Sequence, residues 1–260
     1  MDHTRLQLLP ETLPWRTVVG LIAGDADVGV VADATMQAAQ RGLEIADGDE
    51  GLKQTFWLLS HIPLAARQDD FPTALKQIGV VVLPEPSVFY IVAGFTSAID
   101  QHLRETRSRT DIGEIAQMAG AECLTAVLTK RSGGLFGTTT ADVKRAVNIC
   151  STSPGFSMLA YDFFARFTQR YLTYHLSREL SNHVGQGRRF GDPSEHTEFI
   201  DHLQTHCREA AVSVRDFADG WYSKTNFEGG ISARKAKSFI HVALKKIRRE
   251  LKIRGERDVE

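Results

Sequence analysis

Two histidines and a glutamate are spaced four residues apart between Glu195 and Glu209. Glu198, His202 and His206 would lie on one face of a helix, because side chains four residues apart are one turn apart. A histidine pair with this spacing can chelate zinc or a similar ion. A closed site needs further ligands, and nothing in the sequence brings one close. We favour a solvated polar face, with a metal-dependent enzyme centred on these three residues as an alternative.

A second set of side chains suits anion binding. The segment from Ile231 to Arg254 holds nine of the 31 Lys and Arg residues and a single acid, Glu250. Because the whole chain carries a formal charge of −1, this segment at +8 leaves −9 on the remainder. Such asymmetry predicts an anionic partner for the segment: nucleic acid, a membrane surface or an acidic protein face.

The same segment has the pattern of an amphipathic helix. An apolar seam follows one side, and the cations spread over the remaining surface. The seam lacks Trp, which argues against a membrane. A second basic spot, Arg188 and Arg189, lies in the loop-like stretch GQGRRFGD. The candidate binding residues are therefore Arg188, Arg189, Arg234, Lys235, Lys237, Lys245, Lys246, Arg248, Arg249 and Lys252, and the expected seam residues are Ala236, Ile240, Leu244, Ile247 and Leu251.

Signals for catalysis are weak. There is no Gly-x-Ser-x-Gly elbow, and no Cys lies beside a His that would face it, so the sequence offers no nucleophilic centre. We expect no cofactor and favour a non-catalytic protein. The three cysteines are widely spaced and odd in number, and the first residues lack the pattern of a secretory signal. These features predict a cytoplasmic protein.

The stretch from Thr110 to Arg131 resembles the helix-turn-helix of bacterial transcription regulators. The resemblance rests on Ile115, Ala116, Ala119, Gly120 and Thr125. In such a motif Gly120 would make the turn and the second helix would read base edges in the major groove. Leu124, Val127 and Leu128 depart from it, because they stand where DNA-facing polar residues belong. One continuous helix also explains the apolar spacing, and we favour that interpretation.

The elements that would position these residues are helical. Apolar residues recur every three or four positions, while alternating strand patterns are nearly absent. One short strand is expected at Gly79 to Leu83, and the more apolar run Ser87 to Ile99 is too short to cross a bilayer and predicts a buried helix. Helices are expected at Trp15–Ala23, Gly29–Ile45, Glu50–Arg67, Pro72–Ile78, Ser87–Thr106, Asp111–Lys130, Ala141–Cys150, Pro154–His183, Glu195–Ser223 and Ile231–Arg254.

These elements predict an all-α, irregular multi-helix bundle of about nine to ten helices with long C-terminal helices. Composition supports a folded chain, since 42% of residues are hydrophobic and 24% are charged. We divide it into an N-terminal helical region, 1–150, and a C-terminal helical region, 151–260, ending in the basic amphipathic helix. An aromatic stripe between Phe156 and Tyr174 is expected to pack in the core. Thr139 or Thr140 is expected to cap the helix that follows.

From these features we expect an accessory or binding subunit of a cytoplasmic complex. Its partner would be nucleic acid, contacted through phosphates without base-specific readout, or another protein subunit. One alternative is a solvated surface helix docked on an acidic body. Another is a protein scaffold or homo-oligomer, in which the acidic body of one copy binds the basic segment of the next. The metal-dependent enzyme is the third.

Overall fold

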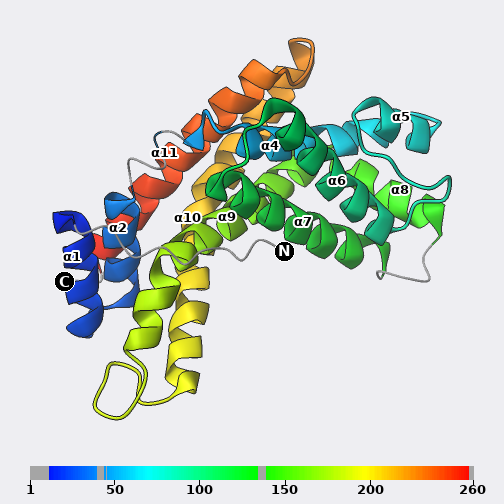
Figure 1. Cartoon of the computed structure of the whole chain (residues 1–260). Helices are drawn as coiled ribbons and strands as arrows, with labels where there is room; N and C mark the ends of the chain where they lie inside the picture. The colour runs from blue at the N-terminus through cyan, green and yellow to red at the C-terminus, as the bar shows by residue number, and fades with distance from the viewer. Residues whose placement is uncertain (1–11, 40–43, 45, 134–138, 258–260) are drawn as a thin grey trace.

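The computed structural model describes residues 12–39, 44, 46–133 and 139–257. The protein is all-α, as predicted, and the described residues include no β-strand. No helix among them combines the length and apolar character needed to cross a bilayer. The helices, shown in Figure 1, are α1 Leu13–Ala23, α2 Val28–Ala38, α4 Glu50–Ala65, α5 Phe71–Gln77, α6 Val88–Thr106, α7 Asp111–Ser132, α8 Thr140–Ile149, α9 Ser153–Asn182, α10 Pro193–Phe227 and α11 Ala233–Arg257.

Side-chain caps explain where most of these helices begin. An oxygen of Asp27, Asp49, Asp70, Ser87, Thr110, Thr139, Thr152 or Asp192 accepts a hydrogen bond from a backbone N–H of the first turn that follows it. These N–H groups have no partner inside the helix, so each cap stabilises its helix by about 1 kcal/mol. Thr139 and Asp142 form a reciprocal capping box at α8, which confirms the cap expected there.

The predicted helix boundaries agree with the structure to within a few residues, except for one predicted helix whose end lies partly outside the described residues. The expected helix Gly29–Ile45 is observed as α2, Val28–Ala38, and residues 40–43 and 45 lie outside the described part of the chain. The last two helices both run further than expected, to Phe227 and Arg257. The predicted continuous helix over Thr110 to Arg131 is confirmed by α7.

Helix α7 continues through Gly120 without a turn, and the glycine is required there by packing. A Cβ at Gly120 would lie 2.7 Å from Cζ of Phe95 on α6 and 2.8 Å from Cγ2 of Thr55 on α4. Both distances are shorter than any normal contact. The glycine therefore permits a close crossing of three helices and makes no turn within α7.

The predicted strand at Gly79 to Leu83 is wrong. Residues 80–83 lack a strand partner within the described chain, and Val80, Val82 and the backbone of Val81 lie against α6 instead. A Cβ at Gly94 of α6 would lie 2.7 Å from the carbonyl oxygen of Val81 and 3.1 Å from Cγ1 of Val80. The missing side chain admits the extended segment to the helix surface, so the β-branched residues are used for packing on a helix.

The aromatic stripe of α9 lies in the core, as predicted. Phe156, Phe163, Phe164 and Phe167 are at most 1% exposed. The stripe meets Phe56 of α4 and Phe239 of α11, whose rings stack with centroids 4.8 Å apart. One contiguous core includes residues on both sides of position 150, the predicted boundary between the N-terminal and C-terminal helical regions.

Helix α11 lies along one edge of this bundle. It forms a hairpin with α10 and also packs on α2 and α4 (Figure 1). It runs from the hairpin tip, at the top of the view, to the helices α1 and α2 at the left. Near its end, a Cβ at Gly255 would lie 2.8 Å from Cβ of Asp33, so a side chain here would force α11 away from α2. This close approach fixes the orientation of α11 on α2, and therefore which side of α11 faces solvent.

Candidate nucleic-acid interface

Helix α11 separates its apolar and basic residues cleanly. All five predicted seam residues, Ala236, Ile240, Leu244, Ile247 and Leu251, are buried, and Phe239 and Ala243 join them. The seam faces α10, α2 and α4, so no apolar face of α11 is left for a membrane or a partner helix. The polar side of α11 faces solvent.

Five cations form a line on that side, which we call the basic stripe: Arg234, Lys237, Lys245, Arg249 and Lys252. All five are exposed. At 3.6 residues per turn they fall within an arc of about 120°, and with a rise of 1.5 Å per residue the line is about 27 Å long. Four of them, all except Lys252, make no ion pair or hydrogen bond with the described residues. Lys252 lies 3.8 Å from Glu256, and its side chain is 62% exposed.

The remaining predicted cations of this segment interact with the protein itself. The Lys235 ammonium donates to the carbonyl oxygens of Glu228 and Gly230. Lys246 lies over the Phe217 ring, 5.8 Å from its centroid. Arg248 is 3.9 Å from Glu44. These contacts hold α11 to its own neighbours, so Lys235, Lys246 and Arg248 are less available to a partner than the basic stripe.

A cavity of about 480 Å³ opens beside the C-terminal half of the basic stripe. Lys245, Arg248, Arg249 and Lys252 line it, together with Asp33 and Gln37 of α2. Asp33 accepts a hydrogen bond of 2.7 Å from Gln37. Burial raises the pKa of Asp33, although Gln37 and Lys252 oppose that rise. Arg248 and Lys252 lie near Glu44 and Glu256, so Lys245 and Arg249 are the cations of this cavity without an acidic partner among the described residues.

Arg188 and Arg189, predicted as a second basic spot, have different environments. The Arg189 side chain is 6% exposed, and its guanidinium donates to the carbonyl oxygens of Leu21, Ile22 and Ala26. It also lies 4.9 Å from the centroid of the Phe199 ring. Arg189 therefore caps the carbonyl groups at the C-terminal end of α1. This placement does not support the predicted phosphate contact. Arg188 is exposed and donates to the carbonyl of Asn182.

The histidine face of α10 gains no additional ligand from the fold. Glu198 and His202 are exposed, while His206 is partly buried and its Nδ1 has no hydrogen-bond partner in the described structure. Within the described residues no group of three or more His, Cys, Asp and Glu side chains is arranged to hold a metal ion.

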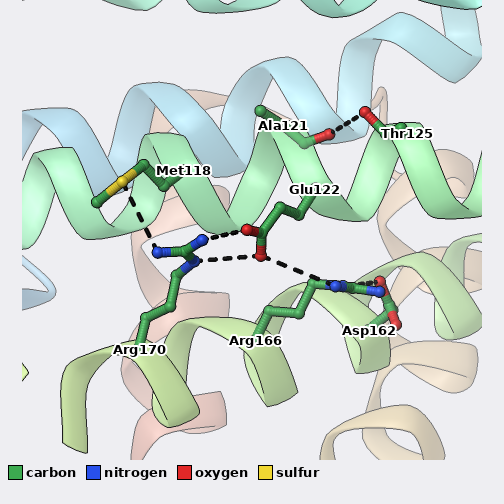
Figure 2. Close-up of polar contacts among 7 residues, drawn as sticks. All are labelled: Met118, Ala121, Glu122, Thr125, Asp162, Arg166 and Arg170. Carbon is green, nitrogen blue, oxygen red and sulfur yellow. Dashed lines mark hydrogen bonds and ion pairs between the residues drawn. The ribbon is translucent and has the colours of Figure 1, made fainter. Parts of the chain in front are cut away.

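A cavity of about 580 Å³ lies between α7, α9 and α10. Figure 2 shows its charged wall, where Glu122 of α7 meets two arginines of α9. Arg170 forms a two-pronged pair with Glu122, and Arg166 lies 3.8 Å from the same carboxylate and 2.6 Å from Asp162. Both arginines are therefore neutralised within the protein. Sequence reasoning missed this network, although Asp162, Arg166 and Arg170 follow each other at four-residue steps.

The buried thiols offer no nucleophile either. Cys123, Cys150 and Cys207 are free and buried. Burial raises the pKa of all three, that of Cys150 to about 11. A thiol with a raised pKa is protonated at neutral pH and reacts slowly.

Comparison with protein families, curated proteins and solved structures found no significant match to this chain. The function is therefore inferred from the geometry and charge of the protein's surfaces.

Proposed function

We propose that the protein binds nucleic acid through the phosphate backbone, with the basic stripe of α11 as the contact surface. The observation that supports this proposal is the line of four exposed cations, Arg234, Lys237, Lys245 and Arg249, that lack any partner among the described residues. The contacts would be to phosphate and would carry no base sequence information.

The geometry of the basic stripe suits a linear polyanion. A DNA duplex carries one charge per about 1.7 Å of axis, so about 16 phosphates lie along a 27 Å line. Each cation therefore has phosphates within its reach. Like charges three or four residues apart destabilise a helix by about 0.2–0.5 kcal/mol per pair, and Lys245 with Arg249 forms such a pair. A bound polyanion would remove this repulsion.

The burial of the apolar seam weighs against a membrane as the partner. Interfacial helices insert an apolar face into the lipid, and that face of α11 is already packed against α10, α2 and α4. The stripe would then reach a membrane only through its charges.

The test replaces the four unpartnered cations of the stripe, Arg234, Lys237, Lys245 and Arg249, with Gln. A matched control variant replaces Lys76, Arg104, Lys130 and Arg131, which are also exposed and lie on other helices. Both variants change the net charge equally. Fluorescence anisotropy with labelled oligonucleotides of unrelated sequence measures the Kd. We expect the stripe variant to bind all sequences far more weakly, by a similar factor, and the control variant to bind nearly as wild type does.

A competing hypothesis is that the stripe binds the acidic body of a second copy. The net charge of −9 outside the basic segment favours it, and α10 exposes Glu195, Glu198 and Asp201. In that case the stripe variant would lower the mass measured by light scattering and leave nucleic-acid binding unchanged. The predicted roles as a subunit of a complex and in the cytoplasm remain predictions, as does the metal-dependent alternative.

A further inference from the structure

A phenylalanine stands almost fully in solvent at the tip of the α10–α11 hairpin. Phe227 is the last residue of α10, and its side chain is 94% exposed. The backbone around it is fixed, because the N–H of Glu228 donates to the Lys224 carbonyl and the N–H of Gly230 donates to the Thr225 carbonyl. Gly229 and Gly230 have φ angles of 91° and 94°, which glycine adopts at little cost. The ring is thus carried on an ordered turn.

The basic stripe begins directly beside this turn. The Lys235 ammonium donates to the carbonyls of Glu228 and Gly230 and so ties the first turn of α11 to the tip. Arg234, the first cation of the stripe, precedes it. On the other side of the turn, Lys224 lies one helical turn before Phe227; its side chain is 76% exposed, and its ammonium lies 3.8 Å from the Glu228 carboxylate. Phe227 therefore lies at the hairpin tip from which the line of cations on α11 begins, and this tip is at the top of Figure 1.

A single ring in this position fits a nucleobase better than a lipid. Among the exposed large hydrophobic side chains of the described residues, Phe227 alone comes from α10 or α11. Lipid insertion uses a broad apolar face, which is lacking here. Base stacking needs one accessible aromatic face beside cations that follow the backbone. The bases of a duplex are covered by their neighbours, whereas those of a single strand can turn towards a ring.

From this arrangement we infer that the protein prefers single-stranded nucleic acid, with Phe227 stacking on an unpaired base while the basic stripe binds the adjacent phosphates. This inference rests on the proposed function and adds the class of nucleic acid. Because every base has an aromatic face, the stacking tolerates any sequence.

The experiment compares single-stranded and duplex probes. The single strands are fluorescein-labelled oligo(dT) and oligo(U) of about 20 nucleotides, which is long enough for both the stripe and the tip. The duplex is a DNA of the same length. The variants are Phe227→Ala and Phe227→Trp, with Phe89→Ala as the matched control, since Phe89 is also exposed but lies on α6.

We expect wild type to bind single strands more tightly than the duplex. Phe227→Ala should weaken single-strand binding about 5- to 150-fold, the loss typical of one stacked base, and change duplex binding less than twofold. Phe227→Trp should retain single-strand binding, and Phe89→Ala should match wild type. The oligo(dT) and oligo(U) probes decide whether DNA or RNA is bound more tightly.

Equal effects of Phe227→Ala on single strands and duplex, or no effect on either, would overturn the inference while the stripe variant still tests the proposed function. If the stripe variant also binds as wild type does, the proposed function fails. Vesicles of phosphatidylcholine and phosphatidylserine in equal amounts are the third probe, after the single strands and the duplex. Binding to these vesicles that depends on Phe227, without binding to single strands, would assign the tip to a membrane and contradict the inference.

Discussion

Replacing Arg189 with Ala should destabilise the fold, whereas replacing its neighbour Arg188 should not. Arg189 donates to three carbonyl oxygens near the end of α1, at 3.1 Å to Ile22 and 3.3 Å to Leu21 among them, and its side chain is 6% exposed. The Leu21 and Ile22 carbonyls also accept backbone hydrogen bonds from Ala26 and Asp25, so the variant loses the hydrogen bonds to the guanidinium and its packing, which typically costs about 1–3 kcal/mol. For a chain of this length that corresponds to a fall in Tm of about 2–12 °C.

Urea unfolding followed by circular dichroism measures the difference in the free energy of unfolding between the two variants. Arg188→Ala should remain within about 0.5 kcal/mol of wild type, as is usual for an exposed side chain. Binding of oligonucleotides by folded Arg189→Ala should equal that of wild type, since the guanidinium is not available to phosphate. If both variants were equally stable, or if Arg189→Ala lost binding without losing stability, the assigned structural role would be refuted.

Two further predictions concern the core. Replacing Gly120 with Ala should cost about 1–3 kcal/mol, since its Cβ would lie 2.7 Å from the Phe95 ring and force α6 and α7 apart; unchanged urea unfolding would contradict this packing. Burial lowers the pKa of His175 from 6.5 to about 4. Between these values the unfolded chain binds a proton that the folded chain does not, so stability should fall by about 1–3 kcal/mol as pH drops from 6.5 towards 4. In His175→Gln this pH dependence should be smaller than in wild type, and an identical dependence would exclude His175 as its source.

Local periodicity was sufficient to predict the helices and their buried faces. The aromatic stripe of α9 and the seam of α11 follow the 3.6-residue repeat, and both are buried as that repeat requires. The strand prediction at Gly79 to Leu83 failed because local β-propensity does not show that Gly94, more than ten residues later, offers a groove on α6.

The properties of individual cations could not be predicted in the same way. Arg188 and Arg189 are adjacent and chemically identical, and the carbonyls to which Arg189 donates belong to residues more than 160 positions earlier in the chain. In α11, Arg248 is paired because Glu44 lies near it, while Arg249 has no such neighbour among the described residues. Which cations remain free for a partner depends on long-range contacts that carry no signal in the local sequence.

The salt dependence of oligonucleotide binding tests the central claim most directly. For a single strand, log Kobs falls with log salt by about 0.7 for each phosphate contact, so five contacts from the basic stripe predict a slope of about −3.5. The variant with Arg234, Lys237, Lys245 and Arg249 replaced by Gln should retain one contact and a slope of about −0.7. The variant at Lys76, Arg104, Lys130 and Arg131 should keep the wild-type slope. A slope that is the same in wild type and the stripe variant, or a wild type that does not bind at low salt, would contradict the assignment of the basic stripe as a phosphate-binding surface.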